Sequence, residues 1–538
     1  MSNIIRECFV RMSDGVELYT MVILPDDGGD RFPTIIRRSP YSAPSESPDV
    51  FKEIPLHGYA QVFQHCRGTG KSKGICIPYV NERSDGLELL DWIRKQDFYN
   101  GELFLMGSSY LSSVHFSYIN TNPPDVKGAL LAVQDTNRYN ILYRNGFFKT
   151  GLHGRWSSTM YKRNMEIERN YCHEIWQTRP ITGITKSIFN ETVPQFEEEY
   201  LHPDRSDHFW QTPEGGSDYA DACNKCSFPI LLVTSFYDLY LDGVFDMWKS
   251  LTPERRCSCA LIVTPFGHAF NPPPRTEPSS IPDFEGGRLS EVCPDFEYLW
   301  FDHCRKGIPL HFFEKGSITY YRLFDKKWLT TTELENSPCP RRFYLAQDRT
   351  LQSSKPSDIG EITYTYNPYA PATFEGGICS AFDGMQVQAK PNSRYDIISF
   401  VSAPLTEELV CEGRIEAELH CRSTAPDTCF YLRLDYVRDG IALPLRDAID
   451  SLCRVEKDYI VGSERIIKFS FPPHAFKLLP GDSLRLDVSS SCFPHYHVHT
   501  NRKGLQTVQT GADICRNTII TGLSSITLFC DKPLKQAE

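Results

Sequence analysis

Short apolar runs alternate with amphipathic segments through the first quarter of the chain. The runs 33–37, 59–63, 103–106 and 128–133 are short and rich in strand-forming residues. The segment 83–94 places its apolar residues on one broad helical face. Strands that alternate with helices predict a parallel sheet wrapped by helices.

The pattern changes twice further along the chain. From about residue 142, aromatic and charged residues crowd together at helical spacing with few strand signals, and strand-like runs return only at 229–235 and 260–264. After about residue 335, short β-type runs are broken by Pro, Gly, Ser and Asp, which predicts a β-sandwich of the jelly-roll type. The predicted domains are an α/β core in two parts (1–141 and 226–335), a helical cap inserted in it (142–225) and a C-terminal jelly roll (336–538).

Composition and charge exclude several classes of protein. A chain of 538 residues is too long for one hydrophobic core, and 41% hydrophobic with 23% charged residues is typical of a globular protein rather than a disordered or coiled-coil one. No apolar run approaches the roughly 18 residues of a membrane helix, and the N-terminus lacks the pattern of a signal peptide. The formal net charge is −11, with Lys and Arg spread out, so we expect neither a nucleic-acid partner nor an anionic membrane surface.

The 19 cysteines are odd in number and scattered, and no secretion signal precedes them. We therefore interpret them as reduced thiols in a cytoplasmic protein. Cys223 and Cys226 form one C-x-x-C pair near Cys257 and Cys259, but no second pair of standard spacing completes a zinc site. A metal there is a minor alternative, and we expect no metal and no cofactor.

The most informative stretch runs from the strand at 103–106 into Gly107-Ser108-Ser109-Tyr110-Leu111, with a helix after it. In the Gly-x-Ser-x-Gly nucleophile elbow, small residues let the chain turn sharply so that the serine hydroxyl stands above the sheet. The helix behind it offers backbone N–H groups to a developing oxyanion. The alternative is a serine that merely caps a helix, and the strand–turn–helix context argues against it.

A nucleophilic serine needs a base, and the base needs an orienting acid. In α/β-hydrolases these follow in the order Ser, Asp or Glu, His, after the ends of later parallel strands. Asp238 follows the strand at 230–235, and His268 follows the one at 260–264. Asp135 also ends a strand and is a weaker candidate for the acid. The predicted catalytic residues are Ser109, Asp238 and His268.

Two other sequence patterns look functional at first, but we interpret neither as a functional site. Gly70-Lys71-Ser72 invites a phosphate-loop interpretation, but His65 stands where that motif needs its first glycine. The acidic run 197–199 is interpreted as a solvated helix face.

Together these residues resemble the cocaine-esterase-like and X-prolyl dipeptidyl aminopeptidase family of serine hydrolases. The resemblance extends along nearly the whole chain. The segments that carry it are Arg37-Arg-Ser-Pro-Tyr41, Arg67-Gly-Thr-Gly-Lys-Ser-Lys-Gly74, Asp85-Gly, Asp91-Trp-Ile, Asn100-Gly101, Gly107-Ser-Ser-Tyr-Leu111, Phe236-Tyr-Asp238 and Ser490-Ser-Cys-Phe-Pro494.

The resemblance implies an α/β-hydrolase core with an inserted helical cap and a C-terminal jelly roll. It also implies an oxyanion hole made by the phenolic hydroxyl of Tyr41 and the backbone N–H of Tyr110. The sequence departs from the family at two positions. Ser112 stands where a glycine is usual, and His65 stands where an acidic residue usually precedes the Arg-Gly loop.

The expected activity is hydrolysis of an acyl ester or amide of a small molecule through an acyl-enzyme. The aromatic cap favours an apolar or aromatic acyl group. Four alternatives stay open: an X-Pro dipeptidyl aminopeptidase, an α-amino-acid ester hydrolase, an acyltransferase and a non-catalytic binding protein. A homo-oligomer also stays open, because the β-domain offers ample surface.

Overall fold

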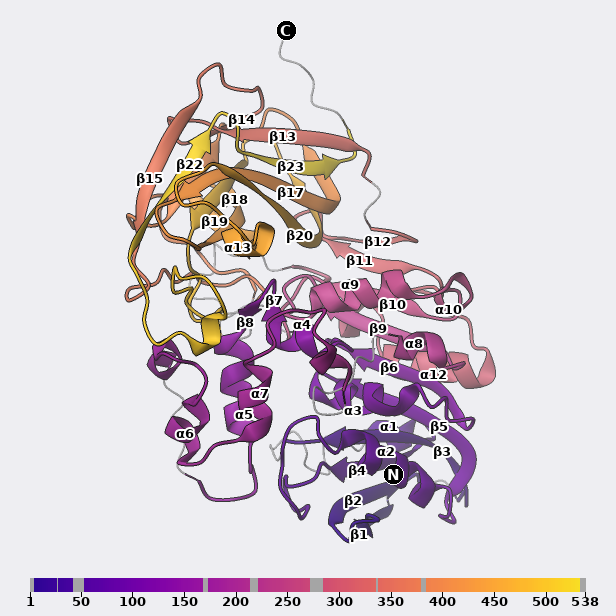
Figure 1. Cartoon of the computed structure of the whole chain (residues 1–538). Helices are drawn as coiled ribbons and strands as arrows, with labels where there is room; N and C mark the ends of the chain where they lie inside the picture. The colour runs from indigo at the N-terminus through magenta and orange to yellow at the C-terminus, as the bar shows by residue number, and fades with distance from the viewer. Residues whose placement is uncertain are drawn as a thin grey trace.

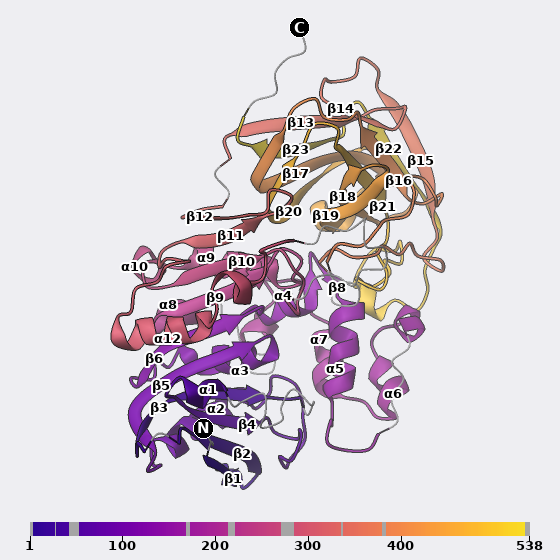
Figure 2. The same ribbon diagram turned by 180° about the vertical axis from the view of Figure 1, so that it is seen from behind.

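The computed structural model describes residues 4–26, 28–41, 53–167, 173–212, 221–270, 284–334, 337–378 and 384–532. Figure 1 shows an α/β core with a group of short helices at its side and a β-rich domain above both. The view from behind shows the same three parts, with the short helices placed below the β-rich domain (Figure 2). The predicted fold class is confirmed, whereas the exact domain boundaries stay predictions.

The core is built on one ten-stranded sheet. Its order is β1-β2-β4-β3-β5-β6-β9-β10-β11-β12, parallel from β4 to β11 and antiparallel at both edges. The strands are β1 Ile4–Arg11, β2 Glu17–Leu24, β3 Phe32–Ser39, β4 Ala60–His65, β5 Tyr99–Ser108, β6 Val126–Ala132, β9 Ile230–Ser235, β10 Ala260–Thr264, β11 Ile318–Arg322 and β12 Lys327–Thr331.

Helices cover both faces of this sheet, because its central strands are apolar on both sides. In β5, Leu105 packs in the cluster that contains Leu89 and Leu90 of α2, whereas its neighbour Phe104 packs with Trp300 of α12. The helices of the core are α1 Glu53–Leu56, α2 Glu82–Ile93, α3 Tyr110–Ile119, α8 Ala222–Lys225, α9 Leu241–Ser250, α10 Pro253–Arg256, α11 Leu289–Val292 and α12 Phe296–Lys306.

The segment 138–211, between β6 and α8, consists mainly of short helices, as the residue spacing indicates, together with one small hairpin that the spacing does not reveal. Its elements are α4 Arg138–Leu142, β7 Tyr143–Arg144, β8 Phe147–Phe148, η2 Thr150–Gly154, α5 Arg155–Met160, η3 His173–Gln177, α6 Ile184–Phe189, α7 Pro194–Glu199 and η4 His208–Gln211. We call this segment the cap.

The acidic run at the end of α7 is not the solvated face that we expected from its sequence. Glu199 is 1% exposed and pairs with the buried guanidinium of Arg138 at 2.6 Å. Glu197 accepts the backbone N–H groups of Gly183 and Thr185. Among the three glutamates, Glu198 alone is exposed. The prediction was wrong because residue spacing places a side chain on a face of a helix but does not reveal which partner covers that face.

The C-terminal domain is formed by mostly antiparallel strands in the order β15-β22-β17-β23-β13-β14-β16-β21-β18-β19, with β20 paired to β17 outside this path. Its elements are β13 Cys339–Leu345, β14 Thr350–Gln352, β15 Gly360–Tyr366, β16 Ile398–Ser402, β17 Leu409–Ser423, β18 Cys429–Arg438, β19 Ile441–Ser451, α13 Leu452–Val455, β20 Arg465–Leu478, β21 Ser483–Ser489, η5 Gln506–Val508, β22 Cys515–Thr521 and β23 Ser525–Cys530.

This domain holds the core at the turn that follows β9. Tyr237 donates its hydroxyl to the carbonyl of Pro444 at 3.0 Å. The buried guanidinium of Arg446 donates to the carbonyl of Phe236 at 2.5 Å and to that of Pro473 at 2.9 Å. Buried carbonyls that accept charged donors are costly to leave unpaired, so these contacts fix the backbone just before Asp238.

Two further expectations can be compared with the described residues. None of their helices has the length and apolar character needed to cross a bilayer. Every cysteine among them is a free thiol.

The buried ion pair of the cap can be tested by removing one charge. Glu199→Gln leaves the Arg138 guanidinium buried without its carboxylate, which costs about 3–5 kcal/mol. We expect a clear fall in the urea midpoint of the cap, measured by tryptophan fluorescence. The matched control is Glu198→Gln, which removes an exposed carboxylate and shifts stability by less than about 1 kcal/mol. Equal midpoints for the two variants would contradict the role of the pair.

Candidate active site

Ser109 occupies a backbone conformation that L-residues rarely adopt. It lies between the last residue of β5 and the first of α3 with φ of 57° and ψ of −129°. Its N–H donates to the carbonyl of Ala132 at 2.9 Å, which ties the turn to the neighbouring strand β6. A Cβ on Gly107 would lie 2.2 Å from the carbonyl oxygen of Leu111, so only glycine fits there. The local structure is therefore the strained nucleophile elbow that the sequence predicts.

Ser112 takes part in holding the elbow. Its hydroxyl donates to the carbonyl of Ala132 at 3.0 Å and accepts the N–H of the same residue at 2.9 Å. A family glycine could make neither bond. Ser112 in place of the usual glycine therefore keeps α3 packed closely on the strands and adds two hydrogen bonds between α3 and β6.

His268 lies between Ser109 and Asp238, as the sequence predicts. Its Nε2 is 2.8 Å from the Ser109 Oγ, and its Nδ1 is 2.5 Å from the Asp238 Oδ2. The Asp238 side chain is fully buried, and its other oxygen accepts the N–H of Tyr240 at 2.8 Å. The His268 side chain is 25% exposed. The arrangement gives a serine hydroxyl, a base within hydrogen-bond reach and a buried acid that fixes the imidazole.

Backbone bonds hold the two loops that carry the acid and the base. The N–H of Phe236 donates to Thr264 at the end of β10, and the N–H of Tyr237 donates to Phe266. These two bonds join the loops after β9 and β10 and so place Asp238 against His268.

Asp135, the weaker candidate for the acid, lies elsewhere. It is buried, and it accepts the N–H of Asn137 at 2.8 Å. A Cβ on Gly243 would collide with its carboxylate, so it packs against the first turn of α9. Burial raises the pKa of Asp135 to about 6. It is Asp238, and not Asp135, that contacts the imidazole.

Tyr41 lies at the site together with a tryptophan of the cap. The Trp156 indole donates its Nε1–H to the Tyr41 hydroxyl oxygen at 3.1 Å. Burial raises the pKa of the Tyr41 phenol, while its contacts with Trp156 and Ser109 lower it less strongly. The phenol is therefore kept protonated, as a hydrogen-bond donor must be. Sequence reasoning did not find Trp156, since nothing in its local pattern distinguishes it from a core aromatic.

Tyr110 opens α3, and the first N–H groups of a helix have no carbonyl partner within it. The Tyr110 hydroxyl is already engaged elsewhere, because it donates to Glu82 at 2.8 Å and accepts the N–H of Tyr79 at 2.8 Å. The phenol thus anchors the start of the helix, and the backbone N–H is the group available for an oxyanion.

The second departure from the family is explained by the loop after β4. Arg67 pairs with Asp85 at 2.6 Å and with Asp14 at 2.5 Å, so its charge is balanced without an acid at position 65. His65 accepts the N–H of Lys71 at 3.2 Å, and its ring packs at a tilt against the ring of Tyr19. The loop is therefore held by a histidine where an acid is usual.

The four thiols near β9 and β10 do not form a metal centre. The Arg255 guanidinium lies 3.6 Å from both the Cys226 and the Cys259 sulfur. This cation therefore occupies the space between the two sulfurs in which a metal ion would have to lie. Burial raises the pKa of the Cys226 thiol to about 12 and holds that of the Cys223 thiol well above its usual value. Among the described residues, no group of three metal-ligating side chains comes together anywhere.

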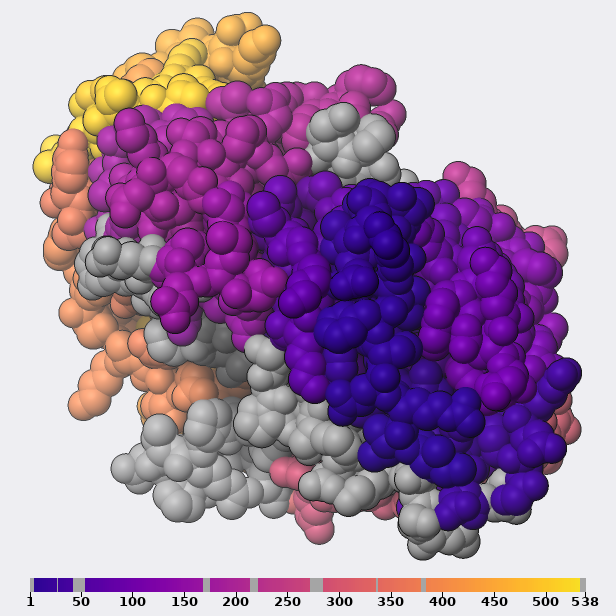
Figure 3. Space-filling view, turned by 90° about the horizontal axis from the view of Figure 1, so that it is seen from below, coloured from indigo at the N-terminus to yellow at the C-terminus, as the bar shows by residue number. Residues whose placement is uncertain are grey.

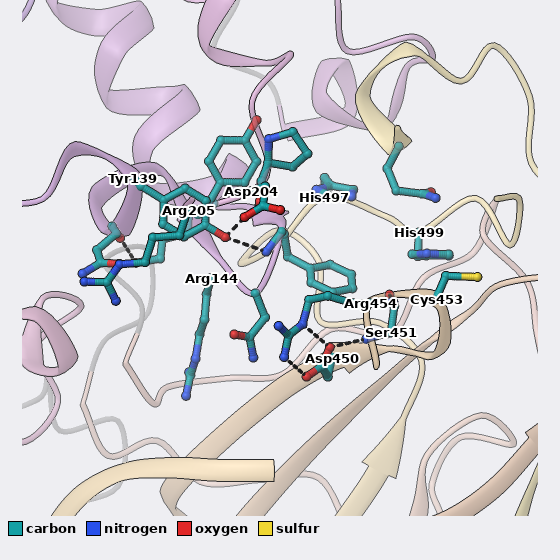
Figure 4. Close-up of a pocket in the computed structure, with 18 of the residues that line it drawn as sticks. Tyr139, Arg144, Asp204, Arg205, Asp450, Ser451, Cys453, Arg454, His497 and His499 are labelled. Atoms are coloured by element: carbon teal, nitrogen blue, oxygen red, sulfur yellow. Dashed lines mark hydrogen bonds and ion pairs between the residues drawn. The ribbon is translucent and has the colours of Figure 1, made fainter. Parts of the chain in front are cut away.

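A cavity of about 1030 Å³ lies between the cap, α9 and the β-rich domain, and charged side chains line much of it. Neither Ser109 nor His268 lines it, but Tyr240 does, and the Tyr240 ring meets the His268 ring edge-on at 5.7 Å. The aromatic side chains of Tyr79, Tyr110 and Trp156 pack around Tyr41 instead. In Figure 4, side chains of the cap and of the β-rich domain face one another across the cavity, among them Tyr139, Asp204, Arg205, Asp450, Ser451, Arg454, His497 and His499.

Family models match both halves of the chain. The X-Pro dipeptidyl-peptidase (S15 family) model matches residues 14–270, and the X-Pro dipeptidyl-peptidase C-terminal non-catalytic domain model matches residues 311–524. The cocaine esterase of Rhodococcus sp. (strain MB1 Bresler) is 22% identical over 557 residues, which cover 94% of each chain.

Solved structures show the same fold over nearly the whole length. An aminopeptidase from the marine sediment archaeon Thaumarchaeota archaeon has a TM-score of 0.82 at 17% identity and covers 98% of this chain and 97% of its own. An α-amino acid ester hydrolase has a TM-score of 0.82 at 20% identity and covers 98% and 96%. With both halves of the chain matched in order, the protein is an enzyme of the S15 (X-Pro dipeptidyl-peptidase) family of serine hydrolases.

Proposed function

We propose that the chain hydrolyses acyl esters or amides of small molecules, with Ser109 as nucleophile, His268 as base and Asp238 as orienting acid. The observation that carries the proposal is the position of the His268 imidazole. Its two nitrogens lie 2.8 Å from the Ser109 hydroxyl and 2.5 Å from a fully buried carboxylate. This geometry suits general-base activation of a serine.

In the first half of the reaction, His268 takes the Ser109 proton as the Oγ attacks the acyl carbonyl. Asp238 holds the proton on Nδ1, so that Nε2 is free to accept, and stabilises the imidazolium that forms. The imidazolium then gives its proton to the leaving alcohol or amine. Ser109 is left carrying the acyl group as an ester.

The negative charge of the tetrahedral intermediate needs donors that are already in place. The Tyr41 hydroxyl and the Tyr110 N–H would supply two, from the end of β3 and the start of α3. Because Trp156 donates to the Tyr41 oxygen, the phenolic proton is directed away from the indole and is free for the oxyanion. In the second half of the reaction, His268 activates a water that releases the acid and restores Ser109.

The surroundings of Tyr41 favour an ester or amide over a substrate with a free amine. An aminopeptidase must hold an ammonium group with carboxylates near the serine. The cap acid Glu166 is exposed, and Glu168 lies outside the described residues. The charge that acts on Tyr41 from the cap is instead the cation of Arg163. We also propose a reducing, cytoplasmic setting, which the free thiols of the described cysteines support.

Ser109→Ala removes the nucleophile and should lower kcat by roughly 10⁴- to 10⁶-fold. The matched control is Ser108→Ala, which changes the exposed neighbouring hydroxyl of the same elbow and should leave kcat within about twofold. Turnover of a p-nitrophenyl ester measures both. Equal losses in the two variants, or none in Ser109→Ala, would refute the assignment of the nucleophile.

Tyr41→Phe removes one oxyanion donor and should lower kcat by roughly 10²- to 10³-fold with little change in KM. Trp156→Phe keeps the ring but loses the N–H that orients Tyr41, so we expect a loss of about fivefold to tenfold. In the double variant the Trp156 change should add nothing, because its hydrogen-bond partner is already gone.

Trp210→Phe is the control for the tryptophan. Its indole is also buried in the cap, but it donates to the carbonyls of His202 and Asp204. Its kcat should match wild type. A loss as large as that of Trp156→Phe would attribute the effect to the stability of the cap rather than to Tyr41.

The nature of the substrate can be tested with one panel. We expect turnover of p-nitrophenyl acyl esters and acyl anilides to exceed that of Xaa-Pro-anilides, since the charge that acts on Tyr41 from the described part of the cap is a cation. Preference for the Xaa-Pro-anilides would instead favour the aminopeptidase. Transfer of the acyl group to an added alcohol or amine in preference to water would identify an acyltransferase. No turnover at all would favour a binding protein.

A further inference from the structure

Arg163 has no carboxylate partner in the part of the chain that the structure describes. Among the described residues, no Asp or Glu pairs with it, and its Nη1 has only the Met160 sulfur at 3.6 Å. Its Nε is buried and has no hydrogen-bond partner. The preceding residue, Lys162, behaves differently, because it pairs with Glu191 at 2.7 Å. Arg163 is therefore the unpaired cation of this turn.

The turn that carries Arg163 is docked on the core on both sides of it. The N–H of Lys162 donates to Cys76 at 3.0 Å. The N–H of Asn164 donates to Gly68 at 3.2 Å, and its side-chain amide donates to Ser72 at 3.1 Å. Figure 3 shows the cap and the N-terminal part of the core side by side. The backbone on both sides of Arg163 is therefore held on the core.

The core loop that holds this turn also reaches the proposed oxyanion hole. Cys66 of that loop packs with Tyr41, Tyr110 and Trp156. In agreement with this placement, the Arg163 charge lowers the pKa of the Tyr41 phenol, against the larger opposite effect of burial. One loop therefore connects the turn that carries Arg163 to the groups that would hold the reacting carbonyl.

A partly buried guanidinium with free N–H groups is costly unless something accepts from it. Its planar fork matches the two oxygens of a carboxylate. Resting on the proposed function, we infer that Arg163 binds a carboxylate carried by the substrate, so that the enzyme acts on anionic acyl esters or amides. One unpaired cation suits a monoanion, whereas a phosphate dianion would call for a second cation, and Lys162 is already paired with Glu191. A substrate ammonium would be repelled.

The test compares esters that differ only in this charge. One pair, p-nitrophenyl butyrate and mono-p-nitrophenyl succinate, places the carboxylate in the acyl part. The second pair, phenyl acetate and 3-carboxyphenyl acetate, places it in the leaving group. The quantity measured is the ratio of kcat/KM for the anionic ester to that for the neutral one.

In the wild type this ratio should exceed one in at least one pair and fall as salt is added. In Arg163→Met it should drop by about 10- to 100-fold, mainly through KM, the effect of losing one charge-assisted hydrogen bond. Arg163→Lys keeps the charge without the fork and should retain part of the preference. Lys162→Met is the matched control and should leave the ratio unchanged.

An unchanged ratio in Arg163→Met, or an equal fall in Lys162→Met, overturns the inference while the proposed function stands. If Arg163→Met does not fold, the inference is tested by the ratio measured for Arg163→Lys and by the salt dependence of the wild-type ratio. A wild-type ratio of one or below in both pairs of esters also overturns the inference. Absence of Ser109-dependent hydrolysis of every ester refutes the proposed function, and the inference with it.

Discussion

The backbone of Ser109 keeps its positive φ because hydrogen bonds to β6 and a glycine at the end of β5 hold the turn in this conformation. A residue with φ of 57° costs of order 1–3 kcal/mol, which the surrounding structure must offset. Here Ala132 of β6 accepts hydrogen bonds from both the Ser109 N–H and the Ser112 hydroxyl, while Gly107 lets the helix approach. The hydroxyl is thereby presented at the edge of the sheet where β9 and β10 also end. Without this turn, the Ser109 hydroxyl would not lie within reach of the His268 base and of the oxyanion donor Tyr41.

The site is completed by parts of the chain that do not belong to the sheet. Arg446, from the β-rich domain, holds the carbonyl of Phe236 two residues before Asp238. Trp156, from the cap, donates to Tyr41. The sheet therefore supplies the reacting groups, and the cap and β-rich domain fix their directions. A displacement of the cap would release the phenol of Tyr41 even if the serine and histidine stayed in place.

The fold and the contact among Ser109, His268 and Asp238 could be predicted from sequence for one reason. The carboxyl ends of parallel strands meet at one edge, so residues that directly follow three such strands converge. The roles of Ser112 and Glu199 could not be predicted in this way. Ser112 depends on the register of Ala132, 20 positions away, and Glu199 on Arg138, 61 positions away. Periodicity assigns a face to a residue, but the partner on that face is decided by tertiary packing. The roles of Trp156 and Arg163 could not be predicted for the same reason.

A crystal structure of the enzyme after reaction with a fluorophosphonate would show which residue is the nucleophile and which groups form the oxyanion hole. We expect phosphorus bonded to the Ser109 Oγ, with its phosphoryl oxygen about 3 Å from both the Tyr41 hydroxyl and the Tyr110 N–H. Phosphorus on another residue, or a phosphoryl oxygen that points away from both donors, would contradict this expectation.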